Sequence, residues 1–298
     1  MVLKKMKVSN KMNKAVIYVL GFFIIALSIS CVEVDLVDKP NTKVSLRLPA
    51  SEEGGAGSYT VEINGQKMTI GADGELSKLS PGLYPMLVYS NSPSITVNNG
   101  IAQVDLLNGQ LNGLPDMFFS KSTEIRLENN AFDNKVIDLE AQVRLLEMII
   151  TPPSGGIYNH ISSIEGKMTG VSGRWDLRNN VVVGPTMEVP VKFVKQDNGT
   201  WLAKLRLLGV FGDKQELIGE ILFSNQSSPL RIKASSLKAN QGEQSLPLQS
   251  DLSDYFKTFN NGKSVPFSLG GVIDLPTESG FVVSINEWQR LNETGTAW

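Results

Sequence analysis

Apolar and polar positions alternate over many short segments of the chain, a period of two that is typical of β-strands burying one face. The clearest case is residues 59–70, where two alternating five-residue segments flank Asn64-Gly65. Asn-Gly supplies the two positive-φ positions of a type I′ turn, which matches the twist of antiparallel strands. We therefore predict a hairpin with one apolar and one polar face. Its predicted pairs are Tyr59 with Ile70 and Val61 with Met68 on the apolar face, and Thr60 with Thr69 and Glu62 with Lys67 on the polar face.

A second hairpin is predicted over residues 94–107, around another Asn-Gly turn. This register places Val97 opposite Ala102 and Ile95 opposite Val104. The repeat of the same turn chemistry indicates a chain built largely from antiparallel strands.

A third hairpin joins residues 189–195 to residues 201–207 through Asp197-Asn198-Gly199. A two-residue loop would place Phe193 opposite Lys204 and mix the two faces. A three-residue loop with Gly199 in the left-handed region keeps one face apolar, so we predict that loop. It pairs Val191 with Leu205 and Phe193 with Ala203.

Residues 136–150 fit two different periods. A strand would bury Ile137, Leu139, Ala141, Val143 and Leu145, whereas a helix would bury Val136, Leu139, Val143, Leu146 and Ile150. The neighbouring segments read as strands and Pro152-Pro153 follows at once, so we favour the strand.

Residues 251–259 place Leu252, Tyr255, Phe256 and Phe259 at helical spacing, with Ser250 or Asp251 as the cap. We predict one short amphipathic helix whose aromatic side chains belong to the core.

Strands every 8–12 residues, separated by Gly, Asn and Pro turns, predict an all-β protein made of β-sandwiches. The best domain boundary is the stretch Thr-Pro-Pro-Ser-Gly-Gly at 151–156. We expect an N-terminal sandwich over 41–150 and a C-terminal sandwich, carrying the short helix, over 151–298.

The first thirty residues read as a secretory signal. Residues 1–14 carry five lysines and no acid, and residues 15–30 form an unbroken apolar run. Sixteen helical residues span about 24 Å, which is shorter than the roughly 30 Å bilayer core. This arrangement predicts a cleaved signal peptide over residues 1–30.

Cys31 is the only cysteine of the chain and directly follows Ser30 at the end of the apolar run. This placement resembles a bacterial lipobox, in which the signal is cut before the cysteine and the cysteine is acylated. Ser28 departs from that pattern, which usually has Leu or Val three positions before the cysteine. The alternative is a plain secretory signal with an unmodified thiol. Acylation would anchor the chain to the outer membrane, because each buried CH₂ contributes about 0.8 kcal/mol.

Residues 31–40 then form a tether that carries three acids within seven residues of Cys31. Such acids resemble the tags that send Bacteroidetes lipoproteins to the outer face of the outer membrane. Alternating acidic and aliphatic residues are also typical of an edge strand.

Charge and composition narrow the classes of function. Without the signal the chain has 23 basic and 30 acidic residues, a net charge of −7, which argues against a nucleic-acid partner. A single histidine and a single cysteine exclude zinc sites of the Cys₂His₂ type and any internal disulfide. His160 has no acidic or nucleophilic partner in sequence view, and no carboxylate pair stands out. We therefore predict a non-enzymatic protein without metal or cofactor.

Three features together resemble the fimbrial anchor and minor-subunit lipoproteins of Bacteroidetes, the FimB/Mfa2-type family related to the fimbrillins. They are the Ser30-Cys31 junction, the segment Ser-Pro-Gly-Leu-Tyr at 80–84, and the closing strands at 272–276 and 280–288 that end in Trp288. The resemblance implies two tandem transthyretin-like/immunoglobulin-like β-sandwich domains on a lipid anchor. It also implies a role in fimbriae and adhesion at the bacterial surface, with fimbrial shaft or accessory subunits as partners.

Fimbrillins that polymerise lose an N-terminal segment after a basic residue, which opens a groove for a neighbour's strand. Here Lys43 and Arg47 lie in a comparable strand, and cleavage at Arg47 would separate the chain from its lipid. The chain would then be a shaft or tip subunit instead of an anchor, and the sequence leaves both open.

A surface glycan-binding lipoprotein of a polysaccharide-uptake system is the alternative function. Such a protein would expose two or three coplanar aromatic side chains as stacking platforms. Buried Trp201 and Trp288 beside a bare sheet edge would instead favour the fimbrial interpretation.

Overall fold

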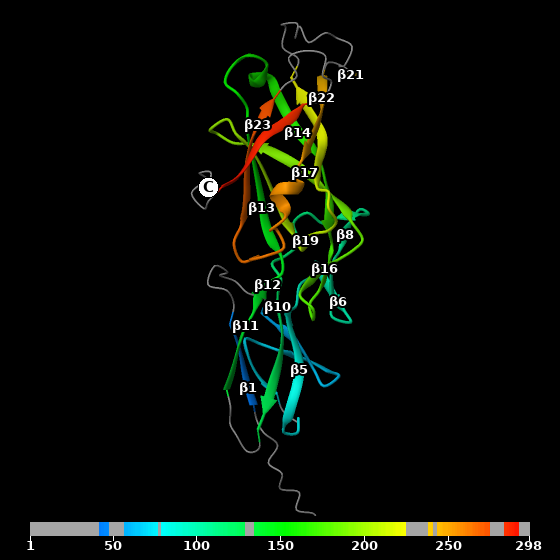
Figure 1. Ribbon diagram of the computed structural model, residues 1–298, viewed down its shortest axis with the longest axis vertical. Helices are drawn as coiled ribbons and strands as arrows, with labels where there is room; N and C mark the ends of the chain where they lie inside the picture. The colour runs from blue at the N-terminus through cyan, green and yellow to red at the C-terminus, as the bar shows by residue number, and fades with distance from the viewer. Residues whose placement is uncertain are drawn as a thin grey trace, which may run out of the picture. The chain divides into compact units, whose positions relative to one another are not determined.

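The computed structural model describes residues 42–47, 57–76, 79–128, 134–224, 238–240, 243–274 and 283–291. The predicted signal peptide, Ser30, Cys31 and the tether lie outside these residues. Most of the described chain is strand, and its only helical segments are a 3₁₀ turn and a single α-helical turn, which confirms the all-β class (Figure 1). No helix in these ranges is long and apolar enough to cross a bilayer.

The first part of the chain forms two sheets around a cluster that we call the smaller core. Val44, Val61, Leu76 and Ile125 lie in it, and their exposure is at most 3%. One sheet has the order β11-β1-β4 and the other the order β12-β10-β5-β2-β3. The strands of the first sheet are β1 (Thr42–Arg47), β4 (Asp73–Leu76) and β11 (Asn134–Asp138). Those of the second are β2 (Tyr59–Ile63), β3 (Gln66–Ile70), β5 (Gly82–Ser90), β10 (Phe119–Leu127) and β12 (Glu140–Ala141).

A ten-stranded sheet surrounds the second cluster, which we call the larger core. Its main path is β21-β22-β20-β14-β17-β18-β13-β23-β24, with β19 paired to β14. Its strands are β13 (Arg144–Thr151), β14 (Ile161–Ser172), β17 (Met187–Lys195), β18 (Trp201–Leu207), β19 (Gly209–Val210), β20 (Glu216–Phe223), β21 (Lys238–Asn240), β22 (Glu243–Asp251), β23 (Phe267–Asp274) and β24 (Ser284–Leu291). A 3₁₀ turn, η1 (Gly156–His160), leads from β13 into β14 and contains the single histidine.

The ten-stranded sheet curls until its two ends meet, so it resembles a nearly closed barrel. The Val283 N–H donates to Pro247 O at 2.7 Å and the Gln249 N–H donates to Val283 O at 3.0 Å. Trp288 Nε1 adds a hydrogen bond of 2.8 Å to Ser250 Oγ across the same seam. Closure satisfies backbone groups that an open edge would leave unpaired. The sequence pattern did not predict it.

Two glycines lie where the neighbouring strands β14 and β20 approach each other closely. Gly166 on β14 pairs with Gly219 on β20, and a Cβ on Gly219 would lie 2.1 Å from Glu165 O. No side chain fits at such an approach, so this position requires glycine.

Two smaller sheets complete the fold. Strands β6 (Ile95–Asn98) and β7 (Ile101–Val104) join β15 (Arg174–Asp176) and β16 (Val181–Val183) in the order β16-β15-β7-β6. Strands β8 (Leu106–Leu107) and β9 (Gln110–Leu111) form a separate hairpin.

The predicted hairpins are confirmed in register. Asn64-Gly65 and Asn99-Gly100 all have positive φ, and every predicted pair of both hairpins is present. In the third hairpin Val194 pairs with Leu202, the register of a three-residue loop, and Gly199 has φ 85°.

Residues 136–150 are extended, so the strand prediction is correct in type, but the segment is three strands and not one. The buried positions change parity where β13 begins. Leu139, Ala141 and Val143 are buried before this point, and Arg144, Leu146, Met148 and Ile150 after it. Leu145, predicted to face the core, is only partly buried, because the chain passes from one core to the other here.

The predicted helix is the single turn α2 (Ser253–Phe256), and the Ser253 N–H donates to Asp251 Oδ1 at 2.9 Å. Phe256 and Phe259 are buried and contact Phe267, which confirms them as core residues. The division into domains at 150/151 stays a prediction. Strand β13, which ends at this point, pairs with β18 and β23 of the ten-stranded sheet.

Candidate functional site

Strand β1 lies between two other strands although it is the first strand of the described chain. It runs parallel to β11, from Lys43 opposite Asn134 to Arg47 opposite Asp138, and antiparallel to β4. Val44 on its inner face has no exposed surface and packs in the smaller core. A strand in this position both completes the sheet and covers the core. Its removal would open a slot between β4 and β11, with apolar residues at its base.

Arg47 is the last residue of β1 and has an exposed side chain. Its guanidinium makes an ion pair with Asp138 on β11 through both carboxylate oxygens, and Nη2 lies 2.9 Å from Oδ2. The hydrogen bond from Arg47 holds the pKa of Asp138 below its usual value. The Leu139 N–H also donates to Arg47 O at 2.8 Å. Arg47, the predicted maturation position, is thus accessible at its side chain, while its backbone is paired.

A second feature of the smaller core is the outer edge of β3. Among the described strands, β3 pairs only with β2, so its other edge has no strand beside it. Lys67 projects from this strand, and an edge lysine is a common protection against unwanted strand pairing.

The polar face of the first hairpin is less exposed than the alternation predicts. Glu62 is only 8% exposed, and it receives Lys67 Nζ and Arg178 Nη2, both at 2.7 Å. Tyr89 Oη donates to it at 3.1 Å. Arg178 follows β15, 116 residues away along the chain. Sequence reasoning placed Lys67 opposite Glu62 but had no signal for Arg178, because that contact depends on tertiary packing.

Two buried basic side chains hold the segment 258–265 against the larger core. Arg144 Nε donates to Val265 O at 2.8 Å, and its Nη1 donates to Phe259 O at 2.7 Å and to Asn261 O at 2.8 Å. Lys263 Nζ donates to Gln142 O at 2.9 Å and to Leu208 O at 2.5 Å. Burial, and then the charge of Arg144, lower the pKa of Lys263, and burial lowers that of Arg144 to about 10. Backbone carbonyls accept hydrogen bonds from both side chains, so their role is structural.

The aromatic side chains provide the test that separates the two functional interpretations. Trp175, Trp201 and Trp288 are 3–4% exposed. Within the described residues Phe211, 37% exposed, is the single exposed aromatic side chain. A stacking platform needs at least two exposed rings close together. The described residues therefore lack the paired exposed rings of a sugar-stacking platform.

Several solved structures share the fold of this chain. The chain superposes on the fimbrial anchor protein Mfa2 from Porphyromonas gingivalis with a TM-score of 0.57 and 8% identity, covering 87% of this chain and 100% of that one. The protein has the fold of Mfa2. A candidate adhesin from Bacteroides ovatus matches with a TM-score of 0.55, 16% identity, and coverage of 86% and 98%. A candidate polysaccharide-binding protein from Bacteroides thetaiotaomicron matches with a TM-score of 0.52, 9% identity, and coverage of 87% and 100%.

No protein-family model and no curated protein sequence matches the chain. The structural match to Mfa2 confirms the predicted resemblance at the level of the fold. At these identities the three-dimensional arrangement is shared while most side chains differ. Any role for this chain has to rest on its own residues.

Proposed function

We propose that the protein is a non-enzymatic outer-membrane lipoprotein that anchors or forms part of a fimbria at the bacterial surface, supporting adhesion. It would do so by β-strand exchange with fimbrial shaft or accessory subunits. The observation that carries the proposal is β1, a short strand held between β4 and β11 over the smaller core, with exposed Arg47 at its end. The Mfa2-like fold supports the same role.

The physical basis is that one strand can replace another in a sheet. Strand β1 contributes backbone hydrogen bonds to two neighbours and an apolar side chain to the core, and a strand from another subunit could supply the same groups. Cleavage after Arg47 would leave β1 without its covalent link to the rest of the sandwich. If the chain stays intact, acylation of Cys31 would keep it on the membrane as an anchor.

The intact mass of the protein purified from its native outer membrane distinguishes these two forms. A mass that begins at Cys31 and includes acyl chains supports the anchor. A mass without acyl chains that begins at residue 48 supports a shaft or tip subunit and contradicts the anchor.

The Arg47→Ala variant tests the maturation position, and Lys43→Ala is its matched control on the same strand. If Arg47 is cut, Arg47→Ala retains the N-terminal segment while Lys43→Ala is processed normally. If both variants begin at the same residue as the wild type, Arg47 has no role in maturation. The Cys31→Ala variant should release the protein from the membrane fraction, and its retention would contradict lipid anchoring.

A further inference from the structure

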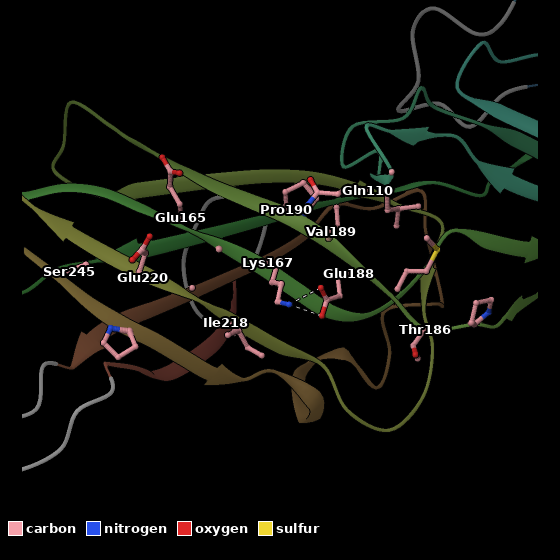
Figure 2. Close-up of a pocket in the computed structure, with 17 residues that line it drawn as sticks. Gln110, Glu165, Lys167, Thr186, Glu188, Val189, Pro190, Ile218, Glu220 and Ser245 are labelled. Atoms are coloured by element: carbon pink, nitrogen blue, oxygen red, sulfur yellow. Dashed lines mark hydrogen bonds and ion pairs between the residues drawn. The ribbon is translucent and has the colours of Figure 1, made fainter. Parts of the chain in front are cut away.

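An open groove of about 1260 Å³ lies on the outer face of the ten-stranded sheet, and no residue of β1 lines it (Figure 2). Residues of β14, β17, β20 and β22 form its floor, and the β8–β9 hairpin contributes Gly109, Gln110 and Leu111 to its wall. Segments from five regions of the sequence thus meet at one surface. The strand-exchange slot does not explain this surface.

Two carboxylates of the groove face each other across neighbouring strands, which is unfavourable in the isolated chain. Glu165 on β14 lies directly opposite Glu220 on the paired strand β20, and like charges in that position destabilise a sheet. Lys192 lies 3.0 Å from Glu165, and Lys167 lies 2.8 Å from Glu188. Within the described residues no cation lies within 4 Å of Glu220. In Figure 2 dashed lines join Lys167 to Glu188, and no such line reaches Glu220. A basic group from another molecule would relieve the repulsion.

The groove also offers apolar surface. Met187, Ile218 and Leu111 line it, together with Pro185, Pro190 and Pro247. The hairpin that forms its wall exposes Leu106 by 49% and Leu107 by 58%. Leucines exposed next to each other on a protruding hairpin favour a partner that covers them. Aromatic side chains are absent from the lining, so the groove lacks the ring surface on which sugars stack.

We propose that this groove binds an extended peptide segment of alternating basic and apolar residues from a neighbouring subunit. Basic side chains would lie against Glu165 and Glu220, and apolar side chains would contact Met187 and Ile218 and one of the two exposed leucines on the neighbouring hairpin. The inference rests on the proposed fimbrial function, because it takes the neighbour to be a fimbrial subunit. It gives the neighbouring subunit a second binding surface, on the ten-stranded sheet, besides the slot between β4 and β11.

Fluorescence anisotropy with the full-length lipoprotein in detergent tests the groove directly. The probe is a fluorescein-labelled octapeptide of alternating lysine and valine, and its counterpart replaces lysine by glutamate. The lysine peptide should bind at low salt and weaken as salt rises, and the glutamate peptide should not bind. Equal binding of both peptides would overturn the proposal.

Two double variants locate the binding site. Glu165→Gln/Glu220→Gln should weaken binding of the lysine peptide by about tenfold, because it removes two charge pairs. Leu106→Ser/Leu107→Ser should weaken it by a similar factor through lost apolar contact. The matched control Glu124→Gln/Asp213→Asn removes two exposed acids elsewhere and should leave the affinity unchanged. Far-UV circular dichroism checks that each variant is folded.

Unchanged affinity in both groove variants would overturn the proposal, as would displacement of the peptide by the neutral oligosaccharide maltoheptaose. These outcomes can be distinguished from a failure of the fimbrial role. If the groove variants bind normally while the Cys31 and Arg47 experiments give the expected masses, the groove proposal fails alone. If those masses contradict both the anchor and the shaft subunit, the proposed function fails first.

Discussion

The sheets around the two cores differ in how their edge strands are arranged. The larger core lies inside a sheet whose ends meet, sealed by Val283 and by the hydrogen bond from Trp288 to Ser250. The smaller core lies between two separate sheets, and its strand β1 depends on pairing with β4 and β11. Removing a strand would uncover either core, but β1 is the first described strand, so a single cut after Arg47 would free it from the smaller core. The comparison therefore favours the smaller core for the strand exchange that we propose.

The largest expected loss of stability comes from a substitution in the closed sheet where β14 and β20 approach each other closely. The Gly219→Ala variant places a Cβ 2.1 Å from Glu165 O, which forces β14 and β20 apart. We expect it to lower the free energy of unfolding by at least about 3 kcal/mol. Gly57→Ala, where nothing lies within 4 Å, is the control. Equal stability of both variants in urea unfolding would show that β14 and β20 do not approach each other so closely at Gly219.

The next effect concerns the buried cation of the larger core. Arg144→Ala removes the donor to Val265, Phe259 and Asn261 and leaves those carbonyls without it. We expect a loss of about 3 kcal/mol and faster amide exchange in the segment 258–265. The exposed Arg126→Ala should change stability little. Unaltered exchange in that segment would contradict the structural role of Arg144.

A smaller effect is expected at the inner face of β1. Val44→Ala leaves a cavity in the smaller core and should cost about 2 kcal/mol. Hydrogen exchange should increase in β1, β4 and β11, while β13, β18 and β23 keep their protection. An equal increase in both sets of strands would mean that the two cores unfold together, which would break the comparison.

The smallest effect is that of pH on the end of β1. The pKa of Asp138 is lowered, mainly by the hydrogen bond from Arg47, so its ionised form is favoured in the folded state. This contribution is complete above the ordinary Asp pKa of about 4 and is lost as pH falls through the lowered value. Amide exchange at the end of β1, measured from pH 6 downward and corrected for intrinsic rates, should therefore rise in acid. Asp138→Asn should remove this pH dependence, and a profile unchanged by that variant would refute the assignment.

Local chemistry made several elements predictable. In the hairpins at residues 59–70 and 94–107 an Asn-Gly turn sets the register, because only residues that tolerate positive φ form that turn. The loop ending at Gly199 was predictable because one choice of length kept apolar residues together. The aromatic residues of α2 followed from helical spacing.

Contacts between distant residues were not predictable in this way. Alternation placed Glu62 on an exposed polar face, but Arg178 covers it from 116 residues away. The change of buried parity between Val143 and Arg144 was missed as well, because a single strand period gives no sign that a chain passes between cores. The groove was not predicted either, because the residues that line it come from β8–β9, β14, β17, β20 and β22, which lie far apart in the sequence.

The sequence by itself determined the all-β class and the hairpin registers, because alternation and turn residues act over a few positions. The resemblance to fimbrial anchor proteins came from short motifs, the Ser30-Cys31 junction and the segments at 80–84, 272–276 and 280–288. Tertiary structure alone decided that β1 pairs in parallel with β11, 91 residues further along the chain, through contacts such as Arg47 with Asp138. It also decided that the ten-stranded sheet closes on itself at Val283. Backbone groups are the same in every strand, so the choice of partner depends on how side chains fill the two cores, and that is set only when the whole chain is packed.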